Sequence, residues 1–103
     1  MTDRIFQRVT TSVGENVADF MLEYGIKAPT LAKMLGVSRS RLQRLLEGAR
    51  CDGDMALRLS RVFPPTSAQY WLNMQATHEL SSAQVEFWTK IQEETTPLEA
   101  PAA

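Results

Sequence analysis

Metal-binding and redox-active residues are almost absent from this chain. Its 103 residues include one cysteine, Cys51, and one histidine, His78. A single cysteine excludes a disulfide within the chain, and these two residues cannot supply the four ligands of a structural zinc site. The sequence also has no phosphate-binding loop and no nucleophile elbow. We therefore expect a protein that is not an enzyme and that holds no metal and no cofactor.

Long apolar runs are lacking as well. No stretch approaches the roughly 18 consecutive apolar residues that a membrane-spanning helix needs. Residues 1–4 do not have the apolar core of a signal peptide. We expect a cytoplasmic protein with no membrane partner, which associates with the nucleoid when it is bound to DNA.

Strand patterns are missing, whereas helical periodicity is clear. No segment alternates between apolar and polar residues for long enough to predict a strand. Apolar residues at positions such as Val13 and Val17 recur at the spacing of an amphipathic helix. The length suits one domain. We predict an all-α domain over residues 12–94, with a flexible segment at 1–11 and a disordered tail at 95–103.

Capping residues indicate where the helices begin and end. Ser12 and Glu15 form a capping-box pattern, and Gly25 and Gly36 are typical of helix ends. The prolines at 64–65 interrupt the helical pattern. The predicted N-caps of later helices are Ser38, Asp52, Thr66 and Ser81. The result is five to six short helices over about 13–24, 29–35, 39–47, 53–63, 67–79 and 82–94.

Charge is distributed unevenly, although the net charge is only −1. Residues 27–61 carry eight basic and three acidic side chains, whereas 1–26 and 62–103 are both net acidic. The local field, rather than the whole-chain charge, is what a phosphate backbone meets. The basic middle segment is therefore a candidate for binding nucleic acid.

Residues 28–47 have the pattern of a helix-turn-helix. Ala32 is a small residue where two helices would cross, and Gly36 follows four residues later, where the turn needs a positive φ. Five apolar positions would hold both helices against the rest of the domain: Leu31, Leu35, Val37, Leu42 and Leu45. The pattern predicts a helix-turn-helix whose second helix begins near Ser38.

Burial of Leu42 and Leu45 leaves a polar face on that second helix. Side chains near the start of such a helix reach base edges in the major groove, where arginine pairs with guanine and glutamine with adenine. We predict base contacts by Arg39, Ser40, Gln43 and Arg44. We predict phosphate contacts by Ser38, Arg41, Thr30 and Lys33. The alternative is a solvated charged face.

Aromatic and apolar residues gather near the C-terminus. One helix-turn-helix makes a small contact, and proteins of this design usually dimerise to place two reading helices about one DNA turn apart. Aromatic residues and methionine are enriched in interfaces. We predict a homodimer formed through Tyr70, Trp71, Met74, Val85 and Trp88. The alternative is that these residues complete the core.

From about residue 14 to residue 92 the chain resembles the HigA-type antitoxins of bacterial toxin–antitoxin modules, which belong to the Xre and lambda-repressor-like group. The matching stretches are Gly14-Glu15, the run from Thr30 to Leu42, Leu45 to Gly48, Ala56 to Leu59, and Tyr70 to Gln75. The last of these, placed after the Ala-Leu-Arg-Leu helix, is the most specific to HigA-like proteins. Ser12-Val13 stands where the family usually has His-Pro.

The resemblance implies a lambda-repressor-like helical fold, a dimer formed through the C-terminal helices, and repression of the protein's own operon at double-stranded operator DNA. It also implies a protein partner, a RelE-like mRNA-cleaving toxin that the antitoxin neutralises. Two other interpretations remain open: a stand-alone Xre-type repressor without a toxin, and a helix-turn-helix that binds only protein. A neighbouring gene encoding one small domain would favour the antitoxin over the stand-alone repressor.

Three smaller features have alternatives. His78 is interpreted as a surface or interface histidine. Cys51 precedes a helix, so a lowered thiol pKa and a redox switch are one alternative for it. Asp52-Gly53-Asp54 is too short for a calcium loop and is interpreted as a turn and cap.

Overall fold

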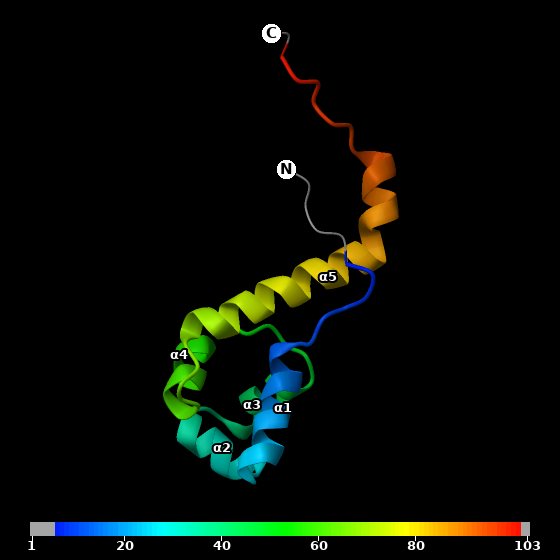
Figure 1. Ribbon diagram of the computed structural model, residues 1–103. Coiled ribbons are helices and arrows are strands. Elements are labelled where there is room, and N and C mark those ends of the chain that lie inside the picture. The colour runs from blue at the N-terminus through cyan, green and yellow to red at the C-terminus, as the bar shows by residue number, and fades with distance from the viewer. Residues whose placement is uncertain (1–5, 102–103) are drawn as a thin grey trace.

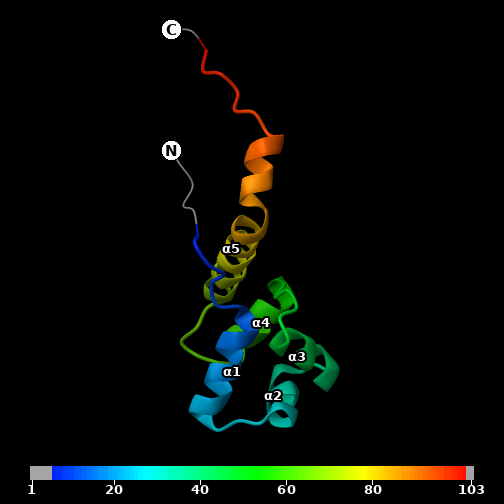
Figure 2. The ribbon, with the colours of Figure 1, turned by 90° about the vertical axis from the view of Figure 1, so that its right-hand side faces the viewer.

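Within the residues that the structure describes, the chain folds into five helices and contains no strand. A computed structural model describes residues 6–101. The helices are α1 (Val13–Tyr24), α2 (Ala28–Leu35), α3 (Arg39–Leu46), α4 (Gly53–Val62) and α5 (Ala68–Glu94). Helices α1 to α4 form a small bundle, and α5 covers one side of it before projecting beyond it (Figures 1 and 2). The predicted all-α fold is confirmed.

Most helix ends follow the predicted capping residues. Ser12 and Glu15 make both hydrogen bonds of a capping box at the start of α1. Gly25 ends that helix with φ of 64°. The Ser38 hydroxyl accepts a hydrogen bond from the Arg41 backbone N–H at 3.0 Å. The side chain of Asp52 accepts one from the backbone N–H of α4's third residue at 2.9 Å. These interactions are local, which is why capping patterns predict them.

The start of α5 differs from the prediction by one residue. Ser67, not Thr66, is the N-cap, and its hydroxyl accepts from the Tyr70 backbone N–H. The Thr66 hydroxyl instead donates to the carbonyl of Phe63 and accepts from Trp71 Nε1 at 3.0 Å. Thr66 thus supplies the hydrogen-bond acceptor that the buried indole N–H of Trp71 needs.

The prediction of separate fifth and sixth helices was wrong, because α5 is continuous from Ala68 to Glu94. Ser81, the predicted N-cap, is fully buried in the middle of this helix. Its hydroxyl donates to the His78 carbonyl at 3.0 Å, three residues earlier, and accepts from the Thr10 backbone N–H at 2.9 Å. Such serine bonds to the preceding turn are compatible with a helix and often bend it. Figure 1 shows α5 bending where the N-terminal segment crosses it.

Residues 6–11, expected to be flexible, lie along α5 and are bonded to it. The Phe6 N–H donates to Gln84 Oε1 at 2.9 Å. The Thr10 carbonyl lies 2.8 Å from His78 Nδ1. Because a carbonyl can only accept, Nδ1 of His78 carries the hydrogen. Residues 1–5, the rest of the predicted flexible segment, lie outside the described residues. The tail forms no helix over residues 95–101, and its disorder stays a prediction.

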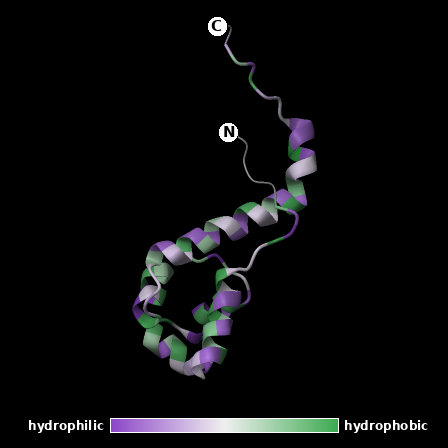
Figure 3. Cartoon of the chain, in the orientation of Figure 1, coloured by the Kyte–Doolittle hydropathy of each residue, from purple (hydrophilic) through white to green (hydrophobic). Residues whose placement is uncertain are grey.

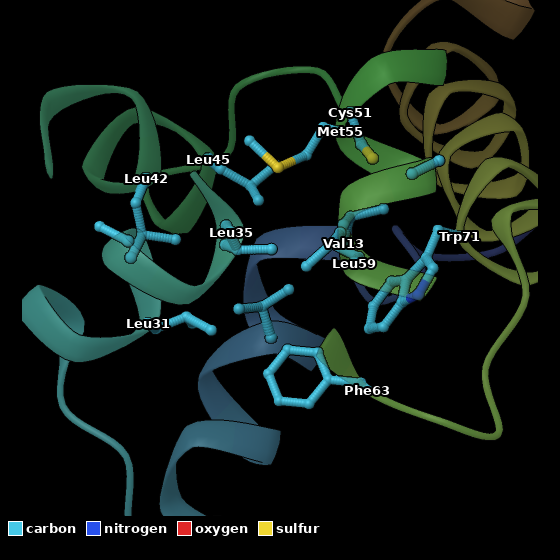
Figure 4. Packing of buried hydrophobic residues seen from close by; sticks show 13 residues of the cluster. Val13, Leu31, Leu35, Leu42, Leu45, Cys51, Met55, Leu59, Phe63 and Trp71 are labelled. Carbon is cyan, nitrogen blue, oxygen red and sulfur yellow. The ribbon is translucent and has the colours of Figure 1, made fainter. Parts of the chain in front are cut away.

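The core lies between α1 to α4 and the first turns of α5 (Figure 4). Trp71 is fully buried there, and its ring meets Phe20 edge-on with centroids 5.7 Å apart. Phe20 also stacks on Phe63 at 5.1 Å. Trp71 was predicted at the dimer interface, and that was wrong, since the whole side chain is used within one chain. The buried apolar residues are Val13, Val17, Leu31, Ala32, Leu35, Leu42, Leu45, Cys51, Met55, Ala56, Leu59, Phe63 and Trp71.

Polar and apolar residues are interspersed along every helix (Figure 3). This holds even for α5, which at 27 residues is the longest. Accordingly, none of the helices within residues 6–101 combines the length and the apolar content needed to cross a membrane.

A close approach between α1 and α3 depends on Gly14. A Cβ added at Gly14 would lie 2.0 Å from the carbonyl oxygen of Leu45. That oxygen belongs to the backbone of α3, so it cannot move aside as a flexible side chain could. The absence of a side chain at Gly14 therefore sets how closely α3 packs against α1.

We expect Gly14→Ala to lower the free energy of unfolding by roughly 1–3 kcal/mol, because overpacking against a backbone outweighs the better helix propensity of alanine. Gly53→Ala is the matched control, because Gly53 begins α4 with nothing within 4 Å of an added Cβ. Urea unfolding of both variants measures the effect. Equal stability of the two variants would contradict the proposed close contact.

Candidate nucleic-acid interface

The turn between α2 and α3 has the predicted helix-turn-helix geometry. Gly36 adopts φ of 71° and ends α2, and the Val37 N–H donates to the Ala32 carbonyl at 3.1 Å. Ala32 is buried at the crossing of the two helices. Of the five predicted apolar positions four are buried, and Val37 is half-buried. The sequence therefore predicted this motif correctly.

The four predicted base-contacting residues lie on one exposed face of α3. Arg39, Ser40, Gln43 and Arg44 are all exposed, and together with Ala28 they line a single surface depression of about 430 Å³. Leu42 and Leu45 are buried on the opposite side of the same helix (Figure 4). The structure thus brings these four side chains together at one place on the surface.

Two guanidinium groups on this face form no ion pair with the residues that the structure describes. Among residues 6–101, no carboxylate lies within ion-pair distance of Arg39 or Arg44. The Gln43 amide donates to Glu47 Oε1 at 3.0 Å, so Glu47 orients that amide. Unpaired guanidinium groups beside an oriented amide suit the recognition of base edges and phosphates.

Three of the predicted phosphate contacts are exposed. Thr30 lies in the first turn of α2, and Lys33 lies in its last turn. Ser38 is exposed, and its hydroxyl oxygen already caps α3 by accepting from the Arg41 backbone. That hydroxyl still has a hydrogen to donate to a phosphate oxygen.

Arg41 does not point outward as predicted. Its Nη2 lies 2.7 Å from Asp54 Oδ1 and 3.7 Å from Asp52 Oδ1, both at the start of α4. These carboxylates belong to the next helix and its cap, so the spacing of residues within α3 does not indicate them. Arg41 therefore connects α3 to α4, and its role as a phosphate contact stays a prediction.

A polar cluster beside the turn between α2 and α3 was not predicted from the sequence. Arg58 Nε donates to Asp54 Oδ1 at 2.7 Å. Arg58 Nη1 donates to the carbonyls of Leu35 and Gly36 at 3.0 and 3.3 Å. Hydrogen bonds from Arg58 and then Arg41 hold the pKa of Asp54 below its ordinary value. The i, i+4 spacing of Asp54 and Arg58 was the available signal, since it places the two side chains together on a helix.

The predicted interface residues on α5 fall into two groups. Tyr70 and Met74 line a groove of about 390 Å³ with Thr10, Thr11, Asn73 and Thr77. Val85 and Trp88 lie further along, with Val85 48% exposed and Trp88 half-buried. Val85 follows Met74 by eleven positions in the helix, which is about 16 Å along the axis. The two groups are therefore separate patches.

Cys51 is not a reactive thiol. Its side chain is fully buried, and burial, followed by the nearby Asp52 carboxylate, raises the pKa of Cys51 to about 11. The pKa is therefore raised rather than lowered as in the redox-switch alternative, because desolvation of the thiolate outweighs the position before α4. The Cys51 N–H donates to Gln75 Oε1 at 2.8 Å, which ties the loop to α5. Within residues 6–101, no cluster of residues suits a metal ion.

The chain is similar to known proteins both in sequence and in fold. No protein-family model matches the chain. Virulence-associated protein I of Dichelobacter nodosus is 40% identical over 67 residues, which cover 64% of this chain and 61% of that protein. The match thus spans less than two thirds of that relative's length.

Two solved structures share the whole fold. An addiction module antidote protein of the HigA family from Coxiella burnetii is 30% identical, with a TM-score of 0.79, covering 87% of this chain and 99% of that one. The Pseudomonas aeruginosa antitoxin HigA, solved with the higBA promoter, is 34% identical with a TM-score of 0.79. This likeness covers 86% of the present chain and 98% of that one.

Proposed function

The chain belongs to the HigA-type antitoxins, a family of DNA-binding regulators rather than enzymes, and from this membership we propose that it binds the operator of its own toxin–antitoxin operon through α3 and represses it. The observation that carries the proposal is the depression lined by Arg39, Ser40, Gln43 and Arg44. A related antitoxin that covers nearly the same length was solved with promoter DNA. A protein that acts on operator DNA works in the cytoplasm and on the nucleoid.

The geometry suggests how the sequence of the operator is read. Arg39 and Ser40 lie in the first turn of α3, the part of a recognition helix that enters the major groove. Gln43 and Arg44 follow one turn later on the same exposed face. The amide of Gln43, oriented by Glu47, can pair with adenine, and the guanidinium groups can pair with guanine.

Phosphate contacts would hold this helix in register. Thr30 and Ser38 lie at the starts of α2 and α3, where free backbone N–H groups and the helix dipole attract anions. Lys33 adds a positive charge beside them. Such contacts give affinity and salt dependence without sequence information.

We expect Arg44→Ala to cost about 1–3 kcal/mol of operator binding, because it removes a base contact. Fluorescence anisotropy with the DNA upstream of the gene measures this. Lys90→Ala is the control, because Lys90 is an exposed cation of α5, four residues before that helix ends. Equal losses of operator affinity in the two variants would mean that Arg44 acts only through its charge, and would refute its role in reading the operator.

We also propose that two copies associate through the projecting part of α5. Val85, Phe87 and Leu80 are each 46–48% exposed there, and Trp88 is half-buried beside them. Exposed apolar side chains grouped on one helix are typical of an interface. A dimer would present two copies of α3 to the two halves of an operator.

Val85→Asp should weaken this dimer by roughly tenfold or more, because it buries a charge in the interface. Leu57→Asp is the matched control: Leu57 is 62% exposed on α4 and receives the same charge. Sedimentation equilibrium gives the dissociation constant of each variant. If neither variant changes the dissociation constant, the dimer interface does not include this part of α5.

The third part of the proposal is a protein partner, a RelE-like mRNA-cleaving toxin that this chain neutralises. Membership of the HigA-type antitoxins supports it. Co-expression with the product of the adjacent gene should yield a complex that elutes as one species and should relieve growth arrest caused by that product alone. If the adjacent product neither binds nor arrests growth, the chain is a stand-alone Xre-type repressor.

A further inference from the structure

One carboxylate oxygen connects three elements of the helix-turn-helix region. Oδ1 of Asp54, in the first turn of α4, accepts from Arg41 Nη2 of α3 and from Arg58 Nε of α4, each at 2.7 Å. Arg58 in turn donates to the carbonyls of Leu35 and Gly36, which end α2. The chain of contacts therefore runs from α3 through Asp54 to the end of α2.

This arrangement adds a restraint at the side of a short helix. Helix α3 has only eight residues, of which Leu42 and Leu45 are buried. Leu46 is half-buried against the core and Gly14 meets the α3 backbone, so rotation of α3 about its axis is resisted mainly from the side that faces the core. The ion pair from Arg41 to α4 acts at the side of the helix, where it opposes such a rotation. A rotation would move Arg39, Gln43 and Arg44 together relative to the DNA.

Asp54 also removes a positive charge from the DNA-facing side. Without its carboxylate, the Arg41 guanidinium would be released close to the exposed face of α3. A released arginine would favour any phosphate backbone, irrespective of sequence.

We propose that Asp54 is a positioning residue that sets the specificity of DNA recognition, by holding α3 through Arg41 and by withholding Arg41 from phosphates. The proposal rests on the proposed function for its effect on DNA, and on the contacts alone for its effect on α3. In this account Arg41 is a positioning residue as well, not a DNA contact.

The test compares Asp54→Asn with Glu94→Gln in the full-length protein. Glu94 pairs with Lys90 at 4.0 Å at the end of α5, outside the helix-turn-helix region. Both substitutions remove one negative charge; Asp54→Asn leaves Arg41 and Arg58 without this partner, and Glu94→Gln leaves Lys90 without its own. Anisotropy with the upstream duplex and with a scrambled duplex gives the ratio of the two affinities for each variant.

We expect Asp54→Asn to bind the scrambled duplex more tightly and to lower the ratio by roughly fivefold, within the range of exposed ion-pair networks. Glu94→Gln should leave the ratio unchanged. Arg41→Gln should lower the ratio without tighter binding to the scrambled duplex. If Arg41→Gln instead weakens binding to both duplexes equally, Arg41 is a phosphate contact and the proposal is wrong.

Hydrogen exchange separates this proposal from the proposed function. In Asp54→Asn, backbone amides of α3 should exchange several-fold faster, while those of α1 keep their rates. If the wild-type protein binds both duplexes equally, operator recognition fails, and the exchange rates alone decide the positioning role. Unchanged exchange in α3, or an unchanged affinity ratio in a protein that does discriminate, would overturn it.

Discussion

The arrangement of the whole molecule depends on how a helix of eight residues is held. A helix this short is not stable in water by itself, so its position comes from tertiary contacts. Leu42 and Leu45 bury one side of α3 in the shared core, and Gly14 lets the backbone of α1 approach it closely. Because that side faces the core, Arg39, Gln43 and Arg44 lie on the opposite, exposed side of the helix.

Electrostatics follows from the same packing. The net charge of −1 does not describe what DNA would meet, because the basic residues are concentrated in α2, α3 and α4. Within that segment the arginines differ in their contacts. Arg41 and Arg58 are paired with Asp54, whereas Arg39 and Arg44 face the depression on α3. On the exposed face of α3, the pairing leaves Arg39 and Arg44 without an ion-pair partner among residues 6–101.

The sequence allowed good prediction of features that depend on near neighbours. The capping box at Ser12, the turn at Gly36 and the buried side of α3 all follow from spacings of a few residues. Ser81 was misjudged because its buried position depends on Thr10, 71 residues away in the chain. Tertiary context of this kind overrides a local capping pattern.

The candidate site was also predictable where it depends on residues close in the sequence, and not where it depends on contacts between helices. The exposed face of α3 followed from helical periodicity, but the direction of Arg41 did not, because its partners lie on α4. Trp71 looked like an interface residue because composition alone cannot distinguish a core aromatic from an exposed one. Only the ring contacts with Phe20 and Phe63 place it in the core.

The most direct test of the account is the binding of the wild-type protein to the DNA upstream of its own gene, compared with a scrambled duplex, over a range of salt concentrations. The account predicts a preference of about a thousandfold or more for the upstream DNA at ~150 mM salt, with affinity falling steeply as salt rises. Equal affinity for the two duplexes, or no binding to either, would contradict it and would leave the helix-turn-helix as a surface for protein partners alone.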